Sequence, residues 1–201
     1  EVQKPLIEFV STVSSSIKVF EAGHCDEEYD FYCPIMSLPL VFKTSLNNVP
    51  YQKPYLSSDP LKISKWLNIL GEKTKPRIGI AWSGSKNNDQ DKHRSTRLKH
   101  FAKFLDEKYE WISLQKEYED DDKEQLSFFN IRDFSNFQTD FTETAAQIEN
   151  LDLVISVDTS IAHCAGAIGK KTIIIIPYTP DWRWQLGTKK TPWYSSVELC
   201  R

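Results

Sequence analysis

The stretch VISVDTSIAHCAGAIGK (residues 154–170) decides the fold. Its apolar beginning predicts a buried strand that ends at Asp158, and a helical pattern of small residues begins directly after it, at Thr159. A strand followed at once by a helix is the unit from which parallel sheets with crossover helices are built. Open α/β sheets bind their ligands beyond the carboxyl ends of such strands. The stretch therefore predicts both an α/β fold and the edge of the sheet at which a site would lie.

The helix start in this stretch has the chemistry of an anion site. Free N–H groups and the positive end of the helix dipole attract phosphate, and Thr159 and Ser160 add hydroxyl donors. His163 lies four residues after Thr159, on the same helix face. The alternative interpretation is structural, with Asp158 capping the helix and His163 buried in the core.

Three more strands and several helices are predicted around this unit. The strand patterns, which are almost continuously apolar, lie at residues 77–82, 110–114, 151–158 and 171–177. Helical patterns lie between them, at residues 98–105, 120–128, 142–151 and 159–169. Buried strands alternating with helices predict a Rossmann-like, doubly wound parallel sheet.

This unit begins with a further helix at residues 59–71, in which Asp59 is the expected N-cap and Gly71 follows the last turn. Residues 47–60, rich in Pro, Asn and Ser, read as a connector. The preceding segment shows a helix near residues 4–13, a strand at 17–20 and a strand running into a helix at 29–42. These elements are too few to close a sheet, so they either pack on the following domain or end a larger one.

Two further strand ends carry anion-binding residues. Ser83, Gly84 and Ser85 follow the first strand, where small residues let backbone amides approach an anion. Lys92 and Arg94 lie in the same polar loop, at residues 82–95, and would supply positive charge. The alternative is a charged surface loop.

The third strand end places Gln115 and Lys116 at the same edge of the sheet. Agreement among three strand ends favours a phosphate site there.

Composition restricts the other possibilities. The chain has 201 residues and a formal net charge of −3, which argues against a general nucleic-acid binder. No apolar run reaches the length of a membrane span, and four cysteines without metal spacing fit a reducing cytoplasm. The acidic run at residues 117–124 is interpreted as a solvated helix start rather than a Mg²⁺ site, so no metal and no cofactor are expected. The aromatic loop at residues 177–196 either covers the end of the sheet or forms a wall on which sugars stack.

Taken in order, several segments resemble a known group. They are YDFYCPIMSLPL, VPYQKPYL, RIGIAWSGS with DKHRS, SLQK, DFTETAAQIENLDLVISVDTSIAHCAGAIGK, and PDWRW with TPWY. This combination resembles the C-terminal glycosyltransferase domain of bacterial tetratricopeptide-repeat proteins, which is related to the lipopolysaccharide heptosyltransferases of glycosyltransferase family 9.

The resemblance implies a GT-B fold, in which two Rossmann-like lobes face a cleft and the C-terminal lobe holds the nucleotide-sugar donor. Residues 1–58 would then be the end of an incomplete N-terminal, acceptor lobe with its linker, and residues 59–201 the donor lobe. Ser83, Ser85 and Lys92 match phosphate-contacting positions of the family. The turn at residues 158–160 matches the one that holds the diphosphate and sugar, and His163 matches the histidine that follows it.

The activity implied is inverting, metal-independent transfer from a nucleoside-diphosphate sugar to a glycan, lipid-linked or protein acceptor. The family's acidic general base lies in a segment that residues 1–56 do not match, so no catalytic residue is assigned. We expect this chain by itself to be inactive and to self-associate through its incomplete lobe. Two alternatives are a non-catalytic nucleotide-, glycan- or protein-binding module and a sugar-nucleotide epimerase on the same fold.

Overall fold

The computed structural model describes residues 1–49, 53–85 and 91–201. Parts of the expected connector at 47–60 and of the loop at 82–95 lie outside these residues. A five-stranded parallel sheet has the order β2-β1-β3-β4-β5. Its strands are β1 (Arg77–Ala81), β2 (Glu110–Ser113), β3 (Leu153–Val157), β4 (Thr172–Ile175) and β5 (Val197–Cys200). The predicted α/β parallel sheet is confirmed, with four of its strands at the expected places.

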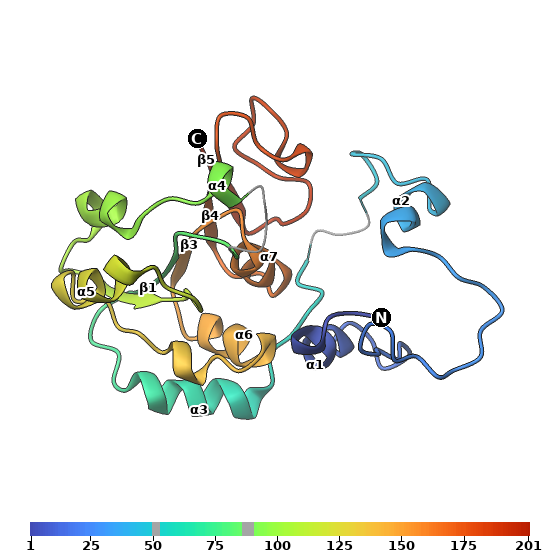
Figure 1. The fold of residues 1–201 in the computed structure, drawn as a ribbon, viewed down its shortest axis with the longest axis horizontal. Coiled ribbons are helices and arrows are strands. Elements are labelled where there is room, and N and C mark those ends of the chain that lie inside the picture. The colour runs from blue at the N-terminus through green and yellow to red at the C-terminus, as the bar shows by residue number, and fades with distance from the viewer. Residues whose placement is uncertain (50–52, 86–90) are drawn as a thin grey trace.

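Helices cover both faces of the sheet (Figure 1). One face packs on α3 (Pro60–Leu70), α6 (Phe141–Glu149) and α7 (Ser160–Ala167), in a core that includes Trp66, Ile148 and Leu114. The other face packs on η3 (Leu98–Phe104) and α5 (Asp120–Phe128), around Trp82 and Trp111. The sheet is therefore doubly wound. The carboxyl-terminal ends of its parallel strands lie at the same edge of the sheet, where open α/β sheets bind their ligands.

Three elements near the sheet differ from the sequence prediction. The segment at 98–104 is a 3-10 helix, and its buried residues Leu98 and Phe101 are three apart, which fits three residues per turn. Strand β5 was not predicted, because four residues at the sheet edge with alternating burial give a short signal. A single helical turn, α4 (Asp91–Arg94), lies within the predicted loop.

The N-terminal segment differs more. It contains η1 (Lys4–Leu6), α1 (Ile7–Ser11), η2 (Ile35–Ser37) and α2 (Leu38–Val41). The strand predicted at 17–20 is wrong, since a strand needs a partner and the described residues there make only one isolated bridge, between Val2 and Glu21. The strand predicted at the start of 29–42 is also wrong, because that part of the chain runs without a neighbouring strand.

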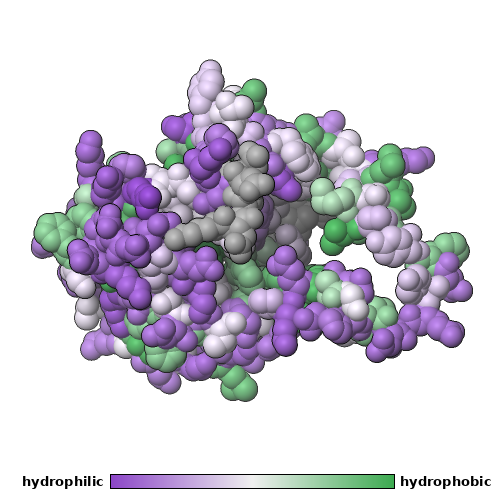
Figure 2. Space-filling view, in the orientation of Figure 1, coloured by the Kyte–Doolittle hydropathy of each residue, from purple (hydrophilic) through white to green (hydrophobic). Residues whose placement is uncertain are grey.

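Residues 29–46 extend away from the sheet and expose large apolar side chains (Figures 1 and 2). The most exposed are Phe31, Leu40, Tyr32, Ile35, Met36 and Phe42. Apolar surface of this extent is uncommon on an isolated soluble domain. The self-association expected through the incomplete lobe stays a prediction.

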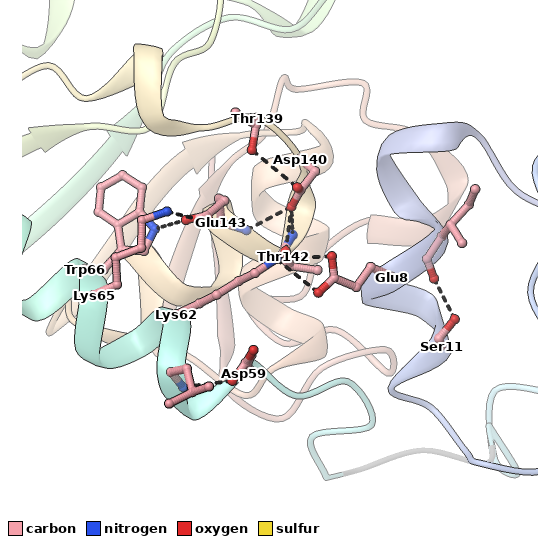
Figure 3. Close-up of polar contacts among 12 residues, drawn as sticks. Glu8, Ser11, Asp59, Lys62, Lys65, Trp66, Thr139, Asp140, Thr142 and Glu143 are labelled. Atoms are coloured by element: carbon pink, nitrogen blue, oxygen red, sulfur yellow. Dashed lines mark hydrogen bonds and ion pairs between the residues drawn. The ribbon is translucent and has the colours of Figure 1, made fainter.

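Helix α1, in contrast, packs against the helices that cover the sheet. Phe9 is buried in the same core as Trp66. Lys62 on α3 donates hydrogen bonds to Glu8 on α1 and to Thr142 at the start of α6, and Figure 3 shows these contacts. Behind them, Glu143 accepts hydrogen bonds from Lys65 and from the buried indole of Trp66. These bonds fix the beginning of α6, which lies at the open edge of the sheet.

Candidate functional site

A cavity of about 300 Å³ lies at the carboxyl-terminal edge of the sheet. We call it the rim cavity. Of the site residues predicted from the sequence it brings together Ser83, Gly84, Ser85, Gln115, Lys116, Thr159 and Ser160. Three strand ends thus meet at one cavity, as the topology requires of parallel strands that share an edge.

Gln115 holds the loop that follows β1. Its side-chain oxygen accepts hydrogen bonds from the backbone N–H groups of Trp82 and Ser83, both at 3.2 Å, and its amide nitrogen donates to the Ser83 carbonyl at 2.9 Å. Because the side chain is buried and these bonds occupy it, we assign Gln115 to positioning the loop.

Gly84 lies close against α4, so a side chain at this position would require Asp91 and Arg94 to shift. A Cβ atom at this position would stand 2.2 Å from Asp91 Oδ1 and 2.8 Å from Arg94 Nη2. The Gly84 N–H donates to Ser95 Oγ at 2.9 Å, and that hydroxyl donates to Asp91 at 2.6 Å. Arg94 pairs with Asp91 at 3.2 Å and does not line the rim cavity.

The start of α7 differs from the other long helices. Among the described helices of eight or more residues, α3 is capped by Asp59, α6 by Asp140 and α5 by a reciprocal capping box. In the described structure α7 has Thr159 at its N-cap, and no side-chain hydrogen bond caps it. The Thr159 hydroxyl pairs with Ser156 at 3.1 Å instead. No side chain of the described residues caps the first N–H groups of α7, and Thr159 and Ser160 line the rim cavity.

Asp158 and His163 face a different group of side chains. The alternative in which Asp158 caps the helix is not what the structure shows, because the N-cap of α7 is Thr159. Asp158 Oδ1 lies 3.7 Å from His163 Nε2. His163 Nδ1 is 2.8 Å from the Tyr194 hydroxyl, and its ring stacks on Trp184 at 5.4 Å. Neither Asp158 nor His163 lines the rim cavity.

The ionisation of His163 follows from this environment. Burial lowers the pKa of His163 below its usual value, and the negative charge of Asp158 opposes this only in part. The imidazole is then neutral at neutral pH, so it offers one donor and one acceptor nitrogen rather than a positive charge.

The lysines lie on two sides of the loop at residues 83–85. Lys116 lines the rim cavity and donates to the Ser135 carbonyl at 2.8 Å. Lys92 is exposed and lines a second cavity, of about 560 Å³, which shares Ser83 with the first. Lys116 therefore lines the rim cavity, whereas Lys92 lines only the neighbouring one.

The beginning of α6 forms a wall of the rim cavity that the sequence prediction missed. Gln138, Thr139, Asp140, Phe141 and Thr144 line it, and Pro5 of η1 lies opposite. Burial alone would raise the pKa of the Asp140 carboxyl, but hydrogen bonds from Thr142 and Glu143 outweigh it, so the pKa is lowered. The pattern of Asp140 followed by Glu143 signals a helix start. The signal does not by itself place this start at the carboxyl edge, because α5 and η4 lie between β2 and α6.

Metal binding and membrane insertion are two other functions on which the structure bears. Within residues 1–49, 53–85 and 91–201, no group of three or more His, Cys, Asp or Glu side chains is placed to hold a metal ion. Among the same residues no helix is both long and apolar enough to cross a membrane.

Comparison with known proteins gives two matches. Residues 137–201, which include α6, β3, α7 and the aromatic loop, match glycosyltransferase family 9 (heptosyltransferase). The fold is similar to the solved structure of E. coli ADP-heptose LPS heptosyltransferase II, with a TM-score of 0.52 and 16% sequence identity. That similarity covers 73% of this chain and 44% of the heptosyltransferase, so this chain spans less than half of its structural relative. The curated proteins compared with the sequence contain no match.

Proposed function

We propose that the protein is a glycosyltransferase whose rim cavity binds the diphosphate of a nucleoside-diphosphate sugar. The transfer would invert the anomeric centre and need no metal ion. The family 9 match supports this proposal, because it includes the turn at Asp158–Ser160 and the whole of α7.

The observation that carries the proposal is the uncapped start of α7 at the rim cavity. Unpaired N–H groups at a helix start need a partner, and a phosphate oxygen satisfies several of them while it also meets the positive end of the dipole. The hydroxyls of Ser83, Ser85 and Ser160 surround the same cavity and can donate to the remaining phosphate oxygens.

The same groups suit the departure of the diphosphate. As the bond from the sugar to the leaving oxygen breaks, negative charge builds on the diphosphate. Fixed N–H groups of α7 and the ammonium of Lys116 would stabilise that charge without rearranging. An acceptor hydroxyl must lose its proton as it attacks, and this proton would go to a general base. We assign no residue of this chain to that role.

Removing single phosphate contacts should weaken binding and leave the fold intact. We expect Lys92→Ala and Thr159→Val each to reduce nucleoside-diphosphate affinity by up to about tenfold. A full charge-assisted hydrogen bond contributes about 1.5–3 kcal/mol, but Lys92 lines the neighbouring cavity and the Thr159 hydroxyl already pairs with Ser156. Thr159→Val keeps the shape of the side chain, and Ser156 retains its bond to the Val157 carbonyl. Calorimetric titration with UDP, ADP and GDP measures the effect.

The matched control is Lys99→Ala, which removes the same charge from an exposed position that lines neither cavity. Its affinity should equal that of the unmodified protein at the same salt concentration. Unchanged affinity in both Lys92→Ala and Thr159→Val would place the diphosphate elsewhere. Release of nucleoside diphosphate from a sugar donor in the presence of EDTA tests the metal-independent chemistry separately.

A further inference from the structure

Only some aromatic side chains of the loop between β4 and β5 cover the sheet. Trp184 and Tyr194 are buried in the core beneath it, as the first of the two sequence interpretations requires. Trp182 is 65% exposed and Tyr178 is 90% exposed. Two exposed aromatic rings in one loop form an apolar surface on which a ligand can pack.

The Trp182 ring is exposed and also held in place. It lies on η5 (Trp182–Trp184), a turn capped by Asp181, whose carboxylate accepts the Arg183 N–H at 3.0 Å. Trp193 packs on the ring at 5.9 Å with the planes nearly perpendicular, and the Arg183 guanidinium lies 5.1 Å from its centre. Trp193 also donates from its indole to the Arg183 carbonyl. With Arg183 over the ring and Trp193 packed against it, 65% of Trp182 still remains exposed.

Polar groups suited to hydroxyl recognition stand beside this ring. Arg183 Nη1 pairs with Asp181 Oδ1 at 2.6 Å, and both side chains are about a third exposed. The pair has no net charge, and its partly exposed side chains carry both N–H donors and carboxylate acceptors. An open aromatic face packs on the apolar C–H face of a pyranose ring, while neighbouring donors and acceptors bind its hydroxyls.

The position of this surface relates it to the rim cavity. Strand β4 leads directly into the loop, so η5 lies beyond the carboxyl ends of the strands, as the rim cavity does. Trp184 of the same turn stacks on His163 of α7, the helix whose start lines the rim cavity. The packed contact between η5 and α7 holds the exposed ring in a fixed relation to the donor site.

We propose that Trp182, with Asp181 and Arg183, forms a subsite for an uncharged pyranose ring of the glycan acceptor. This inference rests on the proposed glycosyltransferase function. Stacking on Trp182 supplies the apolar contact, and the Asp181–Arg183 pair orients the ring through its hydroxyls. Saccharide binding at this subsite does not depend on a nucleotide in the rim cavity.

The test is a titration of the protein with maltotriose, chitotriose and mannotriose, followed by indole fluorescence and by saturation-transfer NMR. We expect saturable binding of at least one trisaccharide, and Trp182→Ala should weaken it at least about tenfold, a loss of about 1.4 kcal/mol. The matched control is Phe128→Ala, which removes an 83% exposed ring from α5, and its saccharide affinity should be unchanged.

Nucleoside-diphosphate affinity is measured on the same variants and should not change in Trp182→Ala. This second reading separates the two proposals, because loss of the diphosphate site would leave trisaccharide binding in place. Two results would overturn the subsite: no saturable binding of any of the three trisaccharides, or binding that Trp182→Ala does not weaken. A Trp182→Ala change in sedimentation coefficient without any saccharide effect would assign the ring to a protein contact instead.

Discussion

Ser160→Asp should make the helix start more stable and at the same time abolish most diphosphate binding. Ser160 is exposed and occupies the first position of α7. An acidic side chain there interacts favourably with the helix dipole, which adds about 0.3–1 kcal/mol to stability. The same carboxylate would lie beside the phosphate oxygens, where repulsion between like charges should lower affinity by about a hundredfold.

Ser160→Asp is informative because it should raise the stability of the protein and lower its affinity for the diphosphate. Thermal unfolding gives the first quantity, and calorimetric titration with a nucleoside diphosphate gives the second. Ser160→Asn is the control of equal size without charge, and it should bind within a few-fold of the unmodified protein. If Ser160→Asp binds as tightly as Ser160→Asn, the diphosphate does not approach the start of α7.

Arg77→Met should produce the largest loss of stability. The Arg77 side chain is fully buried, and its Nε pairs with Glu110 at 2.6 Å. Its Nη2 donates to three carbonyls at the end of α3, those of Leu70, Gly71 and Glu72. Breaking a buried ion pair costs about 3–5 kcal/mol, and because Arg132 still pairs with Glu110 we expect a loss at the lower end of that range. Urea denaturation measures the change in the free energy of unfolding, provided that the slope of this free energy against urea concentration is the same in both proteins.

The control for Arg77→Met lies on the same carboxylate. Arg132 also pairs with Glu110 and donates to the Leu70 carbonyl at 2.8 Å, but its side chain is 37% exposed. Water can replace its bonds, so Arg132→Met should cost clearly less than Arg77→Met. Equal losses of stability in the two variants would show that burial does not make the bonds of Arg77 more important than those of Arg132.

The fold was predictable where the local pattern and the tertiary structure agree. Four strands and the helices at α3, α5, α6 and α7 carry buried apolar runs or caps that any parallel arrangement would preserve. Strand β5 and the segment before residue 49 were not predictable in the same way. A short edge strand, or an apolar run such as the one near residues 17–20, forms a strand only where a neighbour is in place, and local sequence does not specify that neighbour.

The sequence predicted which strand ends would form the site, but it did not predict the role of each side chain there. Topology brings Ser83, Gln115 and Thr159 to one edge, and their roles there depend on side-chain geometry that spacing does not fix. Gln115 faces back onto the loop, and His163 turns toward Tyr194 and Trp184. Wall residues such as Gln138 and Pro5 come from segments without phosphate chemistry, so a search for anion-binding residue types passes over them.

The most direct test of the central claim follows the backbone amides during titration with a nucleoside diphosphate. In ¹⁵N-labelled protein with EDTA present, the resonances of Ser160, Ile161 and Ala162 should shift with one saturable dissociation constant, together with those of residues 83–85. Amides at the capped start of α6 that bond to Asp140, those of Thr142 and Glu143, should move less. A saturable titration in which the amides of residues 160–162 stay fixed, or the absence of any binding, would contradict the account.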